Sequence, residues 1–250
     1  MKNHKARAER TECEKCPLRE IRQFRDFDPD ELEFVSNFKK GELHTDPGAT
    51  ILVEGSNNPH IYTVLTGWGF RSKLLEDGRR QILNYIMPGD MIGLQGSIMG
   101  EMEHSVEALS AMTLCVFERE YMMNLYEKHP DLGYDVTWIA AREERILDEH
   151  LVSVGRRTAL ERAAYLLAYI HQKATAVGLA QAERSDLAIT QQHIADTLGL
   201  SIVHTNKTLR KLAQKNLIIW KERGCEVLSV EGLLEVAGWE GMPEKCRPLI

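Results

Sequence analysis

Two cysteines near the start of the chain, Cys13 and Cys16, are separated by two residues, and a third, Cys115, lies far downstream. Thiolates at C-x-x-C spacing can bind one soft metal ion or close a reversible disulfide. The chain has five cysteines in 250 residues and no recognisable export signal. We therefore expect free thiols, metal ligation or redox sensing rather than a framework of disulfides.

Several roles remain open for these thiols. Cys13 and Cys16 could sense redox state or hold a metal, or they could be a vestigial pair on a mobile amino-terminal arm. Cys115 stands in an apolar run and could equally be a small buried side chain. Zinc or haem is a further alternative, but no two of the candidate histidines have ligand spacing. These histidines are His4, His44, His60 and His104.

Side chains suited to DNA recognition gather in residues 189–212, whose pattern predicts a helix, a tight turn and a second helix. Thr190 and Ser201 can each accept a free backbone N–H at the start of a helix, and Gly199 fits the left-handed position that ends the first helix. A second helix with basic residues on its outer side is typical of a reader of the major groove. The residues expected at DNA are Thr190, Gln191, Ser201, Val203, His204, Asn206, Lys207, Arg210 and Lys211.

The spacing of apolar residues in the second helix supports this interpretation. A helical period predicts an inward face that consists of Ile202, Thr205, Leu209 and Leu212. Of the outward residues, Lys207 can donate to guanine, and Asn206 could pair with adenine. Val203 cannot accept a hydrogen bond from cytosine, but it could contact a thymine methyl group.

The residues after this motif predict a β-hairpin wing. A strand should begin at Leu217, Arg223 and Gly224 offer a turn, and residues 227–230 can return. Residues 187–229 carry six Lys or Arg against three Asp or Glu, although the whole chain has a net charge of −6. The charge that phosphates require is therefore local.

The upstream half has a different pattern of apolar residues and glycines, which predicts an antiparallel β-structure. Short apolar runs between Gly48 and Phe117 alternate with glycines, as in a barrel or jelly roll. A long helix is expected at about residues 132–152 and a second at about 158–175. The long helix carries an apolar stripe, interrupted by charged residues 142–145, which we expect to pair in a parallel coiled coil. The residues of this predicted dimer interface are Val136, Ile139, Ala140, Leu147 and Leu151.

Together these patterns predict an α+β chain of five parts. They are a cysteine-containing arm (1–28), a jelly-roll (double-stranded β-helix) sensor domain (29–128), a dimerisation helix (129–153), a winged helix-turn-helix domain (154–240) and a tail (241–250). With 43% hydrophobic and 27% charged residues, the chain reads as soluble and globular, and no apolar run is long enough for a membrane span. We expect a cytoplasmic protein that does not bind membranes.

A β-roll, a long helix and a winged helix in this order resemble the Crp/Fnr family of bacterial transcription regulators. The resemblance covers nearly the whole chain. Its most specific pieces are residues 88–93, PGDMIG, and the helix-turn-helix, and Gly67 and residues 114–117 also look family-like. The resemblance implies a homodimer that places two recognition helices in half-sites about one turn of DNA apart, with RNA polymerase as a partner.

The resemblance favours the Fnr/FixK-like branch over the branch that binds cyclic AMP. Cyclic-nucleotide members resemble one another in a Gly-Glu pair and an Arg-Ser or Arg-Thr pair, whereas residues 93–94 here are Gly-Leu and residues 100–107 contain three glutamates and no arginine. We therefore do not expect cyclic AMP as a ligand, because these glutamates would repel its phosphate.

The iron-sulfur members resemble this chain in Cys13, Cys16 and Cys115, but the usual third cysteine after the pair is missing. An iron-sulfur cluster would need Cys225, Cys246 or another ligand. The recognition helix also departs from Fnr-like members, in which a glutamate, a serine and an arginine contact the bases, so the standard half-site is in doubt.

Three functions therefore compete. The first is a homodimeric, sequence-specific DNA-binding transcription regulator that responds to oxygen, redox or nitrogen-oxide signals. The second is the same regulator without a cofactor, constitutive or controlled by a small molecule. The third is a cupin-type metalloenzyme, which is disfavoured because the sequence shows no recognisable set of catalytic residues.

Overall fold

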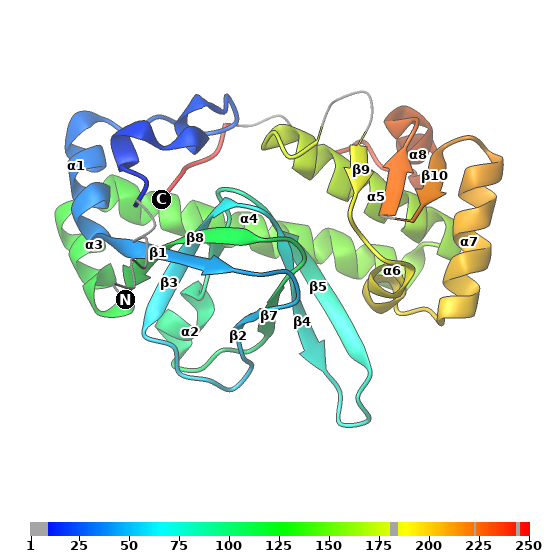
Figure 1. Ribbon diagram of the computed structural model, residues 1–250, viewed down its shortest axis with the longest axis horizontal. Coiled ribbons are helices and arrows are strands. Elements are labelled where there is room, and N and C mark those ends of the chain that lie inside the picture. Colours follow the sequence, from blue (N-terminus) through cyan, green and yellow to red (C-terminus); the bar gives the residue numbers. More distant parts are fainter. Residues whose placement is uncertain (1–9, 181–184, 223, 244–245) are drawn as a thin grey trace, which may run out of the picture.

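The computed structural model describes residues 10–180, 185–222, 224–243 and 246–250. A β-roll occupies the centre, and a long helix, α4, runs behind it from the amino-terminal helices to the carboxy-terminal unit (Figure 1). No helix among these residues is both long and apolar enough to cross a membrane. The α+β architecture with a jelly roll, a long helix and a winged helix-turn-helix is confirmed.

The β-roll consists of two antiparallel four-stranded sheets, ordered β1-β8-β3-β6 and β2-β7-β4-β5. The apolar runs identified in the sequence form β3, β5, β6 and β8, whose inward side chains make the core of the roll. The other four strands are less apolar and were not individually predicted. The eight strands are β1 (Lys39–Thr45), β2 (Thr50–Leu52), β3 (His60–Thr66), β4 (Gly69–Leu74), β5 (Arg80–Ile86), β6 (Met91–Ile92), β7 (Ser105–Ala108) and β8 (Met112–Glu118).

Short helices surround the roll. Asp28 caps α1 by accepting the backbone N–H of Glu31, whose side chain in turn accepts the N–H of Asp28. Gly93, at φ 89°, begins α2 in a left-handed conformation that favours glycine. These helices are η1 (Cys13–Lys15), η2 (Pro17–Glu20), α1 (Pro29–Phe38), α2 (Leu94–Met99), η3 (Arg119–Tyr121) and α3 (Met122–Lys128).

The two long helices have the predicted positions, with slightly different ends. Helix α4 covers Pro130–Arg156, and α5 covers Ala159–Ala176. Thr158 caps α5 by accepting the backbone N–H of Glu161. Pro130 suits the first turn of α4 because a helix start leaves its N–H groups unpaired anyway.

Helix α4 buries one side against the protein's own core, which corrects part of the predicted dimer interface. Val136 and Ile139 are buried within the protomer and offer no surface to a partner. Ala140, Leu147 and Leu151 are exposed, as a seam requires. The charged residues that interrupt the stripe do not all face the seam, because Arg142 and Glu143 point into a buried ion cluster.

The carboxy-terminal unit contains α6, α7 and α8 beside a three-stranded antiparallel sheet, ordered β10-β11-β9. The returning wing strand is Gly224–Val227, so the predicted return over 227–230 was too late, and Val230 begins α8 instead. Arg223 lies outside the described residues. The remaining elements are β9 (Ser185–Leu187), α6 (Gln191–Leu198), α7 (Ile202–Gln214), β10 (Ile218–Lys221), β11 (Gly224–Val227) and α8 (Val230–Ala237).

The described part of the amino-terminal arm packs on the molecule, so the alternative of a mobile arm is wrong from Arg10 onward. Leu18 and Phe24 are buried, and Arg10 donates to the carbonyl of Lys39. The carboxy-terminal tail returns to this arm through a parallel bridge between Phe24 and Arg247. Arm and tail therefore lie side by side above the roll (Figure 1).

Candidate DNA interface

Hydrogen bonds at the helix ends fix the geometry of the helix-turn-helix. Thr190 Oγ1 accepts the backbone N–H of His193 at 3.1 Å, and Ser201 Oγ accepts that of His204 at 3.3 Å. Gly199 ends α6 with φ 65°, which lets the chain turn directly into α7. The predicted caps and turn are thus confirmed, and they determine which side of α7 faces outward.

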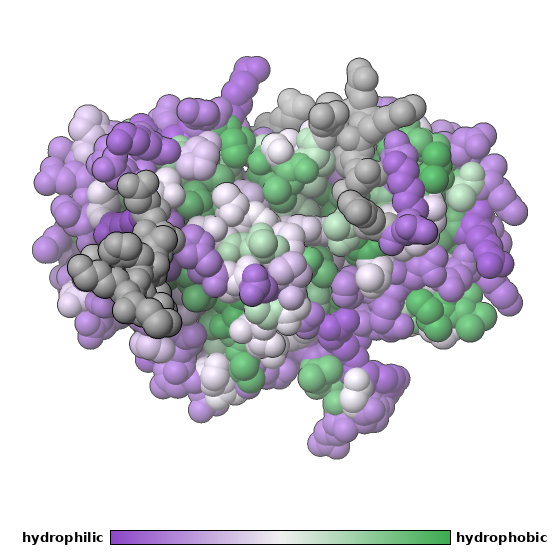
Figure 2. Space-filling model, viewed as in Figure 1, coloured by the Kyte–Doolittle hydropathy of each residue, from purple (hydrophilic) through white to green (hydrophobic). Residues whose placement is uncertain are grey.

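The outward face of α7 is exposed and basic. Val203 is 62% exposed, and His204, Lys207, Arg210 and Lys211 are also exposed. Hydrophilic side chains cover most of the right-hand edge of the molecule, where α7 lies, and a hydrophobic patch lies at the lower end of this edge (Figures 1 and 2). Such an exposed basic helix has the shape and charge to enter a major groove.

The inward face of α7 differs from the prediction at one position. Thr205, Leu209 and Leu212 are buried, but Ile202 is 38% exposed, because it lies at the first turn, and Thr208 is buried further along. Asn206 is half-buried. Its Oδ1 is enclosed without a hydrogen-bond partner among the described residues. The carboxamide would therefore have to turn before it could meet a base.

The remaining predicted DNA residues and the wing flank this face. Thr190 is exposed, and Gln191 is half-buried at the first position of α6. In the wing, Lys221 Nζ lies 2.7 Å from Glu226 Oε2, so part of its charge is neutralised. Cys225 is fully buried in the same sheet, which leaves it available neither to DNA nor to Cys13 and Cys16.

Helix α6 is fastened to the β4–β5 hairpin of the roll. Arg80 Nη2 and Asp196 Oδ2 lie 2.9 Å apart, and the hydroxyls of Tyr85 and Thr197 lie 2.8 Å apart. Arg80 thereby neutralises the negative charge of Asp196, so this carboxylate offsets less of the positive charge of α7. The orientation of α7 consequently depends on the roll as well as on its own unit.

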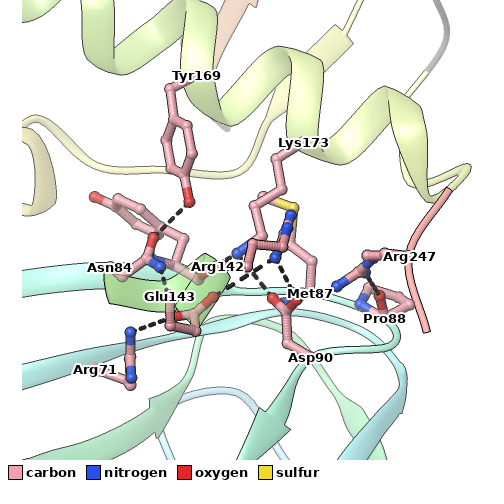
Figure 3. Close-up of polar contacts among 11 residues, drawn as sticks. Arg71, Asn84, Met87, Pro88, Asp90, Arg142, Glu143, Tyr169, Lys173 and Arg247 are labelled. Atoms are coloured by element: carbon pink, nitrogen blue, oxygen red, sulfur yellow. Dashed lines mark hydrogen bonds and ion pairs between the residues drawn. The ribbon is translucent and has the colours of Figure 1, made fainter. Parts of the chain in front are cut away.

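A buried ion cluster ties α5 and the tail to the roll (Figure 3). Asp90 Oδ2 lies 2.8 Å from Lys173 Nζ, and Asp90 Oδ1 lies 2.8 Å from Arg247 Nη1. Burial alone would raise the pKa of Asp90, but the charges of Lys173 and Arg247 outweigh burial and hold it well below its usual range. Glu143 binds Arg71 and Asn84 in the same cluster.

Sequence reasoning missed this cluster, although one signal was present. Lys173 follows Leu166 and Ile170 at helical spacing, on a face of α5 that is otherwise apolar. A lysine at such a core position predicts a buried carboxylate partner. The identity of that partner requires the tertiary structure, because Asp90 and Arg247 are remote in the chain.

The structure brings Cys13, Cys16 and Cys115 into the surroundings of one buried ion pair. Lys39 Nζ lies 2.7 Å from Glu42 Oε1 and donates to the carbonyl of Thr11 at 2.8 Å. The charge of Lys39 acts on both Cys16 and Cys115. Burial raises the pKa of Cys16, and it raises the pKa of Cys115 to about 11, which disfavours both thiolates.

These residues do not fit an iron-sulfur cluster. Among the described residues, no group of three or more His, Cys, Asp or Glu side chains is arranged to hold a metal ion. A cation, Lys39, already lies beside the three thiols. Cys225 is buried in the wing, and Cys246 is exposed in the tail. Of the candidate histidines, His104 is buried and His44 contacts Thr113, while His4 lies outside the described residues.

In the segment that would hold a cyclic phosphate, several side chains contact other parts of the roll. Ser105 Oγ accepts the backbone N–H of Glu54 at 3.0 Å, and Glu103 lies 3.7 Å from Lys73 Nζ. Met102 is buried in the second core cluster. Residues 93–107 contain no arginine.

Known proteins resemble this chain along most of its length. Residues 42–129 match the family model of a cyclic nucleotide-binding domain, and residues 161–236 match that of a Crp-like helix-turn-helix domain. Nitrogen fixation regulation protein FixK of Bradyrhizobium diazoefficiens is 31% identical over 217 residues, which cover 86% of this chain and 90% of that protein. Transcriptional activator protein FnrL of Cereibacter sphaeroides is 27% identical over 230 residues, 90% of this chain and 92% of that protein.

Among solved structures, FixK2 from Bradyrhizobium japonicum matches with a TM-score of 0.70 and 26% identity, over 78% of this chain and 96% of that one. These relatives are regulators rather than enzymes, which answers the cupin alternative. The cysteine pattern, the cassette without arginine and the exposed face of α7 agree with the same assignment. The chain belongs to the Crp/Fnr family of transcription regulators, in its Fnr/FixK-like branch, and it is a DNA-binding regulator.

Proposed function

We propose that the protein binds a twofold-symmetric DNA site as a homodimer, with α7 of each protomer in one major groove. The observation that carries this proposal is the exposed basic face of α7, held outward by the Ser201 cap and the Gly199 turn. Lys207 and Asn206 would contact bases, whereas Arg210 and Lys211 would contact phosphates. RNA polymerase is the protein partner proposed from the family.

The exposed side of α4 supports the dimer. Residues at alternating steps of three and four are exposed along it, which is the spacing of a coiled-coil seam. They are Thr137, Ala140, Glu144, Leu147, Leu151 and Val154. Beside this seam lies an apolar groove of about 250 Å³, lined in part by Leu83 and Leu198, that a second helix would cover.

Two measurements test this proposal together. Sedimentation of the full chain should give a dimer at micromolar concentration, and a footprint on selected DNA should show two half-sites about one helical turn apart. A monomer that protects a single half-site would contradict it.

For the signal, we propose a thiol-based redox response rather than an iron-sulfur cluster or cyclic AMP. Cys13 is half-buried beside Cys16, and a disulfide between them would alter the arm that packs over Lys39. The closing reaction joins the two sulfurs and releases two protons and two electrons to an oxidant such as a peroxide or another disulfide. The raised pKa values of Cys16 and Cys115 favour the second candidate, a regulator without any thiol sensor.

One comparison distinguishes these two candidates. The protein should be purified without oxygen, assayed for iron and acid-labile sulfide, and titrated with DNA under reducing and oxidising conditions. A thiol sensor should lose or gain DNA affinity on oxidation, and the double variant Cys13→Ser, Cys16→Ser should not. Cys246→Ser is the matched control, because Cys246 is exposed and lies in the tail. Identical DNA binding under both conditions for the unmodified protein would exclude the thiol sensor.

A further inference from the structure

A cavity of about 230 Å³ lies where α4, α5 and the carboxy-terminal tail meet. Four cationic side chains line it: Arg142, Arg145, Lys173 and Arg247. Among the residues that the structure describes, no acidic side chain lines it. Its apolar lining residues include Trp138, Val177 and Met242.

The ion cluster beside this cavity contains more positive than negative charge. Counted over the described part of the chain, its cations are Arg71, Arg142, Lys173 and Arg247, and its anions are Asp90 and Glu143, an excess of two positive charges. Figure 3 shows Lys173, Arg142 and Arg247 converging on Asp90 from three different segments. Uncompensated charge is costly in a buried site, and a bound anion would remove this cost.

Two of the arginines have donors to spare. Arg142 Nη1 lies 3.8 Å from Asp90 and 3.6 Å from Glu143, which is too long for hydrogen bonds, although its side chain is only 13% exposed. Arg145, one turn further along α4, is exposed and has no ion pair within the described ranges. Lys173, by contrast, is bound by Asp90 and by the carbonyl of Tyr85.

The pKa values of two of the cluster's cations agree with this excess of positive charge. Burial lowers the pKa of Lys173 and of Arg247, and the nearby Arg142 lowers both further, while Asp90 opposes the change. A second anion beside these groups would stabilise their charged forms.

We propose that this cavity binds a small organic phosphate monoester, with the phosphate on Arg142 and Arg145 and the organic part against Trp138. A phosphate monoester carries close to two negative charges near neutral pH, which matches the excess of the cluster. The planar guanidinium group of arginine is suited to phosphate oxygens. The cavity has room for several water molecules and hence for a small organic group.

The cavity would remain accessible in the proposed dimer. Trp138, Arg142 and Arg145 lie at steps of four and three along one side of α4, while Leu147 and Leu151 belong to the seam on another side. A ligand there would bridge α4 to Lys173 of α5 and so strengthen the joint between the roll and the DNA-binding unit.

Calorimetric titration of the full chain in the absence of DNA tests this site. The probes are inorganic phosphate and phenyl phosphate, added at constant ionic strength. We expect saturable binding of one ion per protomer, tighter for phenyl phosphate and accompanied by a change in tryptophan fluorescence. Arg145→Gln should weaken both at least about tenfold, since a charge-assisted hydrogen bond is lost. Arg156→Gln is the matched control, because Arg156 is an exposed arginine at the end of the same helix.

Three results would overturn the proposal. The first is the absence of saturation at millimolar concentrations of either probe. The second is equal affinity of the unmodified protein, Arg145→Gln and Arg142→Gln for the probes, which would mean that the ion binds to another surface such as α7. Equal affinity for the two probes would contradict the organic part of the ligand. Arg145 is exposed, so its variant should fold, and its thermal unfolding and DNA binding provide the check.

Discussion

At the scale of single residues, the recognition helix combines side chains of two kinds. Lys207 lies on the exposed face of α7 one turn after Val203, close to where base edges would lie, whereas Arg210 and Lys211 lie further along. Lys207→Ala should weaken binding to the specific site by about 1 to 3 kcal/mol and relax the preference at one base pair. Arg210→Ala should weaken binding to all sequences about equally and reduce the dependence on salt.

Gel-shift titrations of both variants on specific and random DNA, at several salt concentrations, separate these outcomes. Equal losses on the two DNAs for Lys207→Ala would mean that Lys207 contacts only phosphate. Val203→Ala provides a control that changes the same face without changing charge, and it should affect discrimination at a thymine only.

The residues that sequence alone located correctly are those whose roles depend on near neighbours. Thr190, Gly199 and Ser201 act on backbone groups within three residues, so their spacing was sufficient. The prediction that Ile202 faces inward was wrong, because helical periodicity does not take account of the exposed first turn of a helix. Arg247 could not be placed at all, because its partner Asp90 is 157 residues away in the chain.

At the scale of elements, three sides of α4 carry residues with three different roles. One side packs on the roll through Val136 and Ile139, a second carries Arg142 and Arg145, and the third presents Leu147 and Leu151. The sequence showed one apolar stripe and could not divide it between core and partner. A hydrophobic period does not record which surface covers it.

The seam can be tested at its most exposed residue. Leu151 is 71% exposed in the protomer, so Leu151→Lys should not disturb folding, but two lysines facing each other in a parallel pair would repel. The variant should shift toward monomer in sedimentation and lose affinity for a two-half-site DNA. Val152→Lys is the matched control, because Val152 is exposed beside the stripe, and it should remain dimeric. Equal dimerisation of both variants would place the seam elsewhere.

At the scale of the whole molecule, contacts between remote segments join the roll, α4, α5 and the tail into one unit. Two histidines lie near the cluster, one of them buried and the other half-buried. His104 is buried before β7, and His150 Nδ1 lies 2.8 Å from the hydroxyl of Tyr165. Composition and periodicity gave no reason to expect either histidine inside, since both stand among charged residues in the sequence.

These histidines make the stability of the fold depend on pH. Burial lowers the pKa of both His104 and His150 to about 4, with Arg71 and Lys73 adding to the effect at His104 and Lys173 at His150. The unfolded chain, with histidine pKa values near 6.5, binds more protons between these limits, so stability is complete above about pH 7 and falls as the pH drops toward 4. Each histidine should account for about 2 kcal/mol at pH 5.

Urea unfolding at fixed protein concentration measures this loss. We expect the free energy of unfolding to decrease by roughly 4 kcal/mol between pH 7 and pH 5, and the His104→Gln, His150→Gln variant to lose much less over the same interval. Asp90 and Glu143 do not account for a loss in this window, because their lowered pKa values put their protonation in more acidic solution. His44→Gln is the control, since His44 is the partly exposed neighbour of Thr113, and it should retain the full decrease. A decrease of the same size in the double variant would assign the pH dependence to groups other than these two histidines.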